Sequence, residues 1–112
     1  MKIDDLENYS LQLTERYQRF YYSAEAQLIK TEVFEYDLQK GIEIPTSCGF
    51  LEITDYIMSG DDIIGVYLDT YLGGGETKRV EVTLEKEGKI RLMEGHGTVY
   101  RVSDCTFKII KK

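Results

Sequence analysis

The sequence has little of the chemistry from which catalytic and metal sites are built. Its 112 residues include one histidine, two cysteines, one proline and no tryptophan. A single His96 and two distant cysteines do not give the ligand spacing of a zinc site. Gly73-Gly74-Gly75 is not followed by the Lys-Ser/Thr pair of a phosphate-binding loop. We therefore expect no cofactor and no metal.

Long apolar runs are also missing. No stretch approaches the roughly 18 apolar residues of a membrane span. Met1-Lys2 leads directly into Asp4-Asp5, without the apolar region of a signal peptide. Cys48 and Cys105 are too few for a disulfide framework, and we expect reduced thiols. These features indicate a cytoplasmic protein with a single domain over residues 1–112.

Basic residues are scarce in the first half of the chain. The net charge is −6, and residues 1–62 hold 13 acids against 5 bases, whereas residues 63–112 hold 7 acids against 9 bases. Between Glu32 and Asp62 there are 8 acids and Lys40 alone. Such a segment repels nucleic acid and attracts basic protein surfaces. We expect no direct binding to nucleic acid and no membrane contact.

The first quarter of the chain carries a helical apolar pattern. Apolar residues recur at spacings of three and four and predict a long helix over residues 4–30. They are Leu6, Tyr9, Leu13, Tyr17, Phe20, Ala24 and Leu28. A second patch on the opposite side of this helix, formed by Leu11, Tyr22 and Ile29, is a candidate dimer face or second contact.

The rest of the chain has the pattern of strands. Alternating or β-rich segments bounded by turn residues predict about six strands, at residues 32–38, 50–58, 63–72, 76–85, 89–94 and 98–110. The expected fold class is α+β, with the helix packed on a curved antiparallel β-meander. This order of elements is similar to that of cystatin-like and other curved-sheet domains. The Gln-x-Val-x-Gly loop of cystatins is absent, so we assign no family.

Two strand registers can be predicted in detail. A hairpin centred on Gly74 pairs residues whose numbers add to 148, which places Leu68 opposite Val80 and Asp69 opposite Arg79. In the last strand the apolar positions change from even, at Tyr100 and Val102, to odd further on. This change of parity predicts a β-bulge near residues 103–104, which would keep both sets on the inside.

The functional hypothesis is a small acidic, non-catalytic interaction protein. Acids with interleaved tyrosines resemble a nucleic-acid backbone, which favours an inhibitor of a basic, nucleic-acid-binding surface of a partner protein, as in phage anti-defence or immunity proteins. The residues expected to bind the partner are Glu35, Tyr36, Asp37, Glu43, Glu52, Asp55, Tyr56, Asp61 and Asp62.

Two alternatives remain open. A curved sheet wrapped on a helix can enclose a ligand pocket. A small cysteine-dependent enzyme could use Cys48, in an irregular loop that would expose it, or Cys105, with His96 as the base. We expect Cys105 to face inward and assign no catalytic residue.

Overall fold

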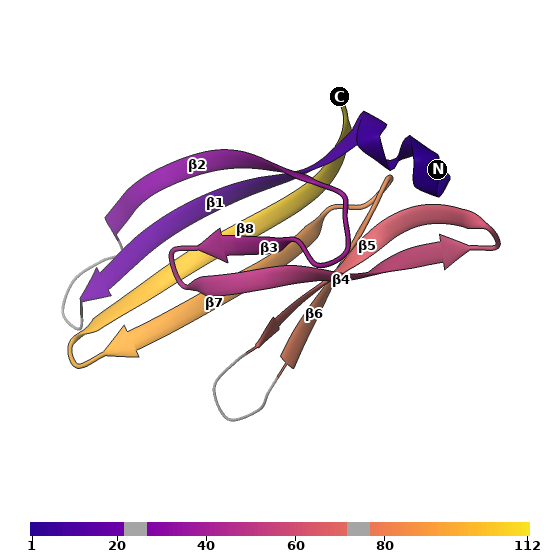
Figure 1. Ribbon diagram of the computed structural model, residues 1–112. Helices are drawn as coiled ribbons and strands as arrows, with labels where there is room; N and C mark the ends of the chain where they lie inside the picture. The colour runs from indigo at the N-terminus through magenta and orange to yellow at the C-terminus, as the bar shows by residue number, and fades with distance from the viewer. Residues whose placement is uncertain (22–26, 72–76) are drawn as a thin grey trace.

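The computed structural model describes residues 1–21, 27–71 and 77–112, which form eight strands and one short 3-10 helix (Figure 1). The elements follow in the order η1 (Ile3–Asn8), β1 (Tyr9–Tyr21), β2 (Gln27–Asp37), β3 (Glu43–Thr46), β4 (Gly49–Ser59), β5 (Asp62–Tyr71), β6 (Thr77–Thr83), β7 (Gly88–His96) and β8 (Val99–Lys111). Strands make up 76% of the described residues. The protein is therefore all-β, and the expected α+β class is wrong.

The helix predicted over residues 4–30 is wrong as well. The described residues of that segment form η1, β1 and the beginning of β2, and the two strands pair antiparallel with Leu13 opposite Phe34. Leu11, Leu13 and Tyr17 are buried, while the polar side chains between them face the other side of the sheet. This period of two is the period of a strand, and it outweighs the helical spacing because it buries these residues between two layers.

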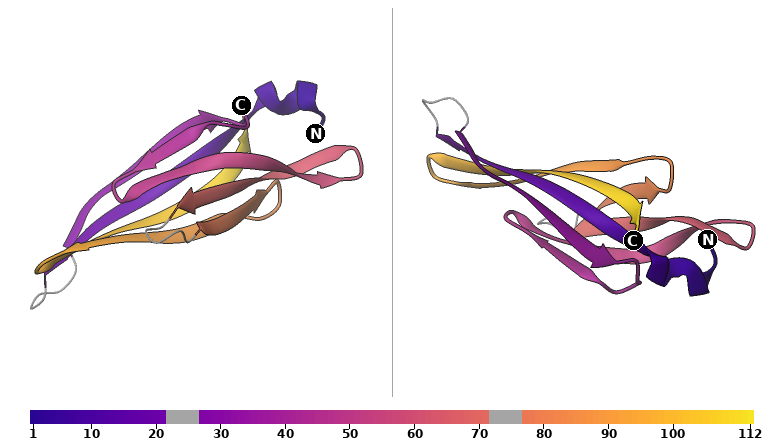
Figure 2. Two further views of the ribbon diagram at one scale, coloured as in Figure 1. Left: turned by 60° about the horizontal axis from the view of Figure 1, so that its bottom comes forward. Right: turned by 90° about the horizontal axis from the view of Figure 1, so that it is seen from above.

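The strands form two four-stranded antiparallel sheets that stack as two layers (Figures 1 and 2). We call them the terminal sheet, in the order β2-β1-β8-β7, and the middle sheet, in the order β3-β4-β5-β6. The chain changes sheet between β2 and β3 and again between β6 and β7. The terminal sheet therefore joins the first and last strands of the chain along their whole length.

The two sheets are displaced relative to each other along their long direction. Figure 2 shows the tips of β1 and of the β7–β8 hairpin projecting beyond the middle sheet at one end. The β4–β5 hairpin projects at the other end, and the molecule measures 52 × 30 × 19 Å. Part of the inner face of the terminal sheet consequently has no strand opposite it.

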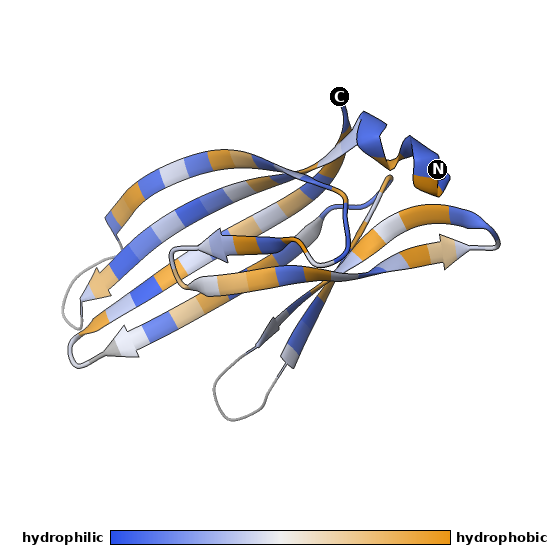
Figure 3. Ribbon diagram, viewed as in Figure 1, coloured by the Kyte–Doolittle hydropathy of each residue, from blue (hydrophilic) through white to orange (hydrophobic). Residues whose placement is uncertain are grey.

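The core lies where the sheets overlap, between their inner faces. Along most strands apolar and polar residues alternate (Figure 3), so that one face of each sheet is apolar. Burial of a large apolar side chain stabilises the fold by about 1.5–3 kcal/mol. The largest fully buried side chains are Phe107, Leu11, Leu13, Ile44, Leu51, Ile53, Leu68 and Leu92.

The register predicted for the β5–β6 hairpin is confirmed. Leu68 lies opposite Val80 and Asp69 opposite Arg79, as the sum of 148 requires. The predicted centre of the turn, Gly74, lies outside the described residues. One register explains both the apolar pairs on the inner face and the charge pair on the outer face, since a shift by one residue would exchange the two faces.

The bulge predicted near residues 103–104 is wrong. β8 pairs with β1 and with β7 without any shift of register. Cys105, Phe107 and Ile109 therefore face the core, while Tyr100 and Val102 lie on the outer face of the terminal sheet. Val102 is nevertheless buried, because an outer apolar cluster that includes Phe20, Met93 and Tyr100 surrounds it. The first part of β8 is therefore apolar on the outer face and the last part is apolar on the inner face. This exchange of the apolar face produces the change from even to odd positions.

Candidate functional site

The outer face of the middle sheet carries a row of three carboxylates. Glu43 on β3 lies opposite Glu52 on β4, and Glu52 lies opposite Asp69 on β5. Arg79 on β6 ends the row opposite Asp69. Neighbouring strands lie about 4.8 Å apart, so the backbone positions of the row follow one another at about this spacing. Within the described part of the chain, no cation lies at ion-pair distance from Glu43 or Glu52.

Asp69 is held in a network at the end of this row. The Arg79 Nε and Nη2 atoms donate to its two oxygens at 2.8 and 3.0 Å, and the Thr54 hydroxyl donates at 2.9 Å. The Arg79 hydrogen bonds, followed by the Thr54 hydroxyl, lower the pKa of Asp69 although burial opposes the shift. The guanidinium also lies 4.6 Å from the Tyr67 ring centroid. Arg79 is therefore occupied within the sheet.

Aromatic side chains lie on the same outer face. The exposed fraction is 44% for Phe50 and 62% for Tyr71, and both lie next to the carboxylate row on β4 and β5. Glu81 on β6 adds an exposed acid opposite Tyr67. We call this surface the acidic face; it consists of Glu43, Phe50, Glu52, Asp55, Tyr67, Asp69, Tyr71 and Glu81.

The nine residues predicted to bind a partner are distributed over several surfaces. Glu43, Glu52 and Asp55 lie on the acidic face. Glu35 and Asp37 lie on β2 of the other sheet, and both are exposed.

The other four predicted residues lie elsewhere. Tyr36 and Tyr56 pack against the core and are half-buried. Asp61 and Asp62 lie at the β4–β5 turn.

Several of the predicted acids have lysine partners. Lys40 pairs with Asp55 at 3.5 Å and Lys2 pairs with Asp62 at 2.8 Å. Lys112 pairs with Asp37 at 3.5 Å. These ion pairs are exposed, so each contributes little to stability. They nevertheless reduce the charge that these acids offer to a partner.

The apolar patch predicted on the back of the helix does not form. Leu11 is part of the core between the sheets, whereas Ile29 lies on β2 and is 45% exposed. Tyr22 lies outside the described residues. The three residues were grouped by helical geometry, and strand geometry separates them.

The two thiols are free and buried, in contrast to the exposed loop cysteine expected at position 48. Cys105 faces inward as predicted. Burial raises the pKa of Cys48, and it raises the pKa of Cys105 to about 12, with the Glu15 charge as the second cause. A raised pKa disfavours the thiolate, which is the nucleophilic form. The side chain of His96 lies outside the described part of the structure.

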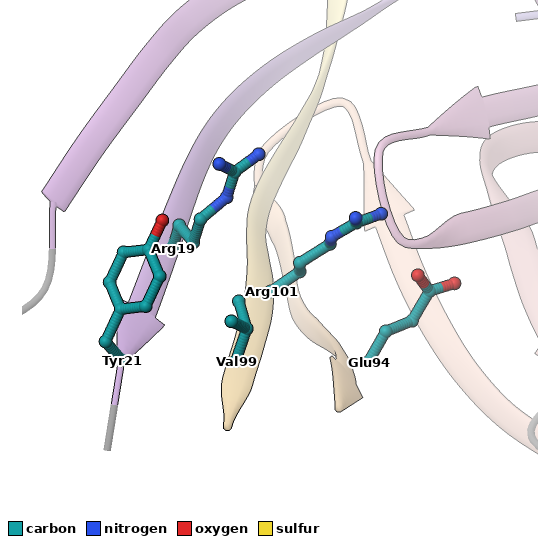
Figure 4. Close-up of a pocket in the computed structure, with 5 residues that line it drawn as sticks. All are labelled: Arg19, Tyr21, Glu94, Val99 and Arg101. Atoms are coloured by element: carbon teal, nitrogen blue, oxygen red, sulfur yellow. The ribbon is translucent and has the colours of Figure 1, made fainter. Parts of the chain in front are cut away.

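A second site lies on the uncovered inner face of the terminal sheet. Arg19 and Tyr21 on β1, Val99 and Arg101 on β8, and Glu94 on β7 line a pocket of about 270 Å³ (Figure 4). Arg19 and Arg101 are cross-strand partners, and Arg101 is in turn opposite Glu94. Because residues 19 and 101 are far apart in the sequence, no local pattern could have brought them together.

We call this pocket the arginine pocket, and its side chains offer more hydrogen-bond donors than acceptors. The side chains of Tyr21 and Tyr17 lie beside the Arg19 guanidinium and raise its pKa through hydrogen bonding. The Arg19 Nε atom is enclosed but donates no hydrogen bond within the described structure. Neither Arg19 nor Arg101 forms an ion pair with a described carboxylate. The pocket can therefore offer several donors to an acceptor-rich ligand.

Among the described residues, no group of three or more His, Cys, Asp or Glu side chains could hold a metal ion. No helix in that part of the chain is long and apolar enough to cross a membrane. A scan against protein-family models, a search of curated proteins and a search of solved structures each find no match. Function is therefore argued below from the residues and their geometry.

Proposed function

We propose that this protein is a small, non-catalytic interaction protein of the cytoplasm that binds the basic, nucleic-acid-binding surface of a partner protein and blocks it. The observation that carries the proposal is the row Glu43–Glu52–Asp69 across three neighbouring strands. Its carboxylates are regularly spaced, and one guanidinium at the end of the row balances only one of them.

The row is unfavourable for the fold itself. Like charges directly opposite each other on neighbouring strands destabilise a sheet, by a few tenths of a kcal/mol to about 1 kcal/mol per pair. Glu43 opposite Glu52 is such a pair, whereas the charge of Asp69 on the other side of Glu52 is balanced by Arg79. A basic partner would relieve the repulsion between Glu43 and Glu52, because its lysines and arginines would lie between the two carboxylates.

The aromatic residues of the acidic face suit the same role. Phe50 and Tyr71 are exposed beside the row, and large aromatic side chains are enriched at the centres of protein interfaces. A surface of acids and aromatic rings offers a basic groove both charge and stacking, as a nucleic acid does.

A charge-neutralising double variant tests the proposal. E43Q/E52Q removes two charges from the row and is expected to fold at least as stably as the wild type. The matched control D4N/E7Q removes two charges from η1, where both side chains are exposed. Nucleic-acid-binding proteins are first enriched from a cell lysate by heparin chromatography. This fraction is then passed over the immobilised wild-type protein and over each immobilised variant.

We expect the wild-type protein and D4N/E7Q to retain the same proteins, and E43Q/E52Q to lose them. Added DNA should compete, and retention should fall as salt increases, because the contact is electrostatic. Equal loss from both variants would show a dependence on net charge alone and would contradict the proposal. If the amount of protein retained did not change with salt or with added DNA, that result would contradict the proposal as well.

A further inference from the structure

The arginine pocket is separate from the acidic face. It lies on the terminal sheet, at the end where β1, β7 and β8 extend past the middle sheet (Figure 2). Nothing in the acidic-face proposal uses it. The displacement of the sheets leaves the inner face open at this place, so that side chains which would otherwise meet the core face a pocket instead.

The two arginines of the pocket bring like charges to neighbouring strands, although their guanidinium groups extend in different directions (Figure 4). Arg19 and Arg101 are cross-strand partners, and like charges in this position repel. Two of the three other strand arginines have a carboxylate partner: Arg79 binds Asp69 and Arg91 binds Asp104, in each case through two hydrogen bonds. The third, Arg16, lies on the outer face of β1 and is exposed. In the described structure Arg19 and Arg101 have no such partner.

The enclosed Nε atom of Arg19 gives an independent indication. A buried donor without an acceptor is unfavourable, and more so when it is charged. This atom is sealed from solvent and unpaired, while the same guanidinium has the Tyr21 side chain on its other side. Among the described residues no carboxylate serves this guanidinium, so a ligand that enters the pocket meets a cation without a counter-ion.

We propose that this pocket binds the phosphate group of a small phosphate monoester between Arg19 and Arg101. A phosphate dianion matches two guanidinium groups in charge and offers enough oxygens for both. A carboxylate, with a single charge, matches only one of them. The pocket volume of about 270 Å³ is enough for a phosphate and a few further atoms.

Glu94 indicates what the rest of the ligand carries. β8 lies between β1 and β7, so Arg101 on β8 lies between Arg19 on β1 and Glu94 on β7 (Figure 4). A phosphate between the arginines is therefore shielded from the Glu94 carboxylate. That carboxylate is free to accept a hydrogen bond from a hydroxyl group on the same ligand, with Val99 as the apolar side of the pocket.

Binding is measured by isothermal titration calorimetry and by amide chemical shifts, with inorganic phosphate, glycerol 3-phosphate and acetate as probes. The wild-type protein should bind both phosphates and prefer glycerol 3-phosphate, while acetate should bind at least about tenfold more weakly, which corresponds to about 1.4 kcal/mol. The shifted amides should lie on β1, β7 and β8.

Three single variants locate the contacts. R101Q should weaken phosphate binding at least about tenfold. R16Q removes the same charge from the outer face of β1 and should leave binding unchanged. E94Q should keep the affinity for inorganic phosphate and lose the preference for glycerol 3-phosphate.

Equal weakening by R16Q and R101Q would overturn the proposal, and so would acetate binding as tightly as phosphate. Absence of phosphate binding to the folded wild-type protein would also overturn it. E43Q/E52Q serves as a further control, since it should retain phosphate binding. Failure of the phosphate site is thus distinguishable from failure of the acidic-face proposal.

Discussion

The Glu15 carboxylate on β1 accepts a hydrogen bond from the backbone N–H of Ser47 at 2.8 Å. Ser47 lies in the β3–β4 turn, so this contact connects the terminal sheet to the middle sheet. The Ser47 hydroxyl lies 3.4 Å from the second oxygen of the same carboxylate. Glu15 is 3% exposed and occupies an inward position between Leu13 and Tyr17. An acid thus stands in the apolar stripe of β1 because the turn opposite supplies a donor.

Removal of this acceptor should destabilise the protein. Glu15→Ala leaves the Ser47 N–H without its partner, and a hydrogen bond to a charged group contributes about 1.5–3 kcal/mol. We expect the free energy of unfolding in urea to fall by about 2 kcal/mol. Glu15→Gln retains a carbonyl acceptor and should lose less. A Glu15→Ala protein as stable as the wild type would show that the contact does not hold the sheets together.

The Asp69–Arg79 pair should make stability depend on pH in the acid range. Because the folded-state pKa of Asp69 is lowered, its contribution is fully present above the unfolded carboxyl pKa of about 3.9. The contribution is lost as the pH falls through the lowered folded-state value. We expect Asp69→Asn to be less stable than the wild type at neutral pH, and the difference to shrink as the pH falls below about 4.

Asp61→Asn is the matched control for this pH dependence. Asp61 is exposed in the β4–β5 turn, and the same Asp-to-Asn change there should have little effect on stability at any pH. Urea unfolding at a series of pH values measures both variants. A difference between Asp69→Asn and the wild type that stays constant down to low pH would contradict the role assigned to the ion pair.

Both thiols should react slowly in the folded protein. Cys48 is 7% exposed and Cys105 is 2% exposed, and burial raises the pKa of each. With a colorimetric disulfide reagent at mildly alkaline pH, we expect each to react at least about tenfold faster in urea than in buffer. The single variants Cys48→Ser and Cys105→Ser separate the two rates, and Cys105 should be the slower. Fast labelling of Cys48 without urea would restore it as a candidate nucleophile.

Gly65 should not tolerate a side chain. A Cβ atom at this position would collide with the Val82 carbonyl oxygen and would lie 2.8 Å from the Thr83 Cα atom. Both atoms belong to the backbone of β6 and cannot rotate away, so Gly65→Ala forces the strands apart. We expect a loss of about 1–3 kcal/mol in the free energy of unfolding. Thr77→Ala, at the exposed end of β6, should change it by no more than about 0.5 kcal/mol.

The β5–β6 hairpin could be predicted from the sequence because its residues are local. Val66, Leu68, Val80 and Val82 alternate without interruption, and only one register buries all four. The first strand gave the wrong prediction because Glu15 interrupts the same kind of alternation. A spacing of four also places two residues on the same face of both a helix and a strand, so it does not distinguish the two structures.

The carboxylate row could be predicted only in part. Glu43 and Glu52 were recognised as acids of one segment, but their direct pairing depends on the β3–β4 register. Asp69 belongs to the row, although it was considered only as the partner of Arg79. The tyrosines at 36 and 56 were expected outside and instead pack against the core, because sheet packing decides which face of a strand is inside.

By itself the sequence determined the strands after residue 30 apart from β3, the pairing of β5 with β6, the inward position of Cys105 and the excess of acid in the first half of the chain. These follow from local alternation and from composition. Only the tertiary structure decided that Tyr9–Tyr21 forms a strand and not a helix, since β1 is held between β2 and β8. It also decided that Arg19 meets Arg101 at the open end of the terminal sheet. Such contacts join residues far apart in the chain, and their energy is gained only when the two sheets pack together.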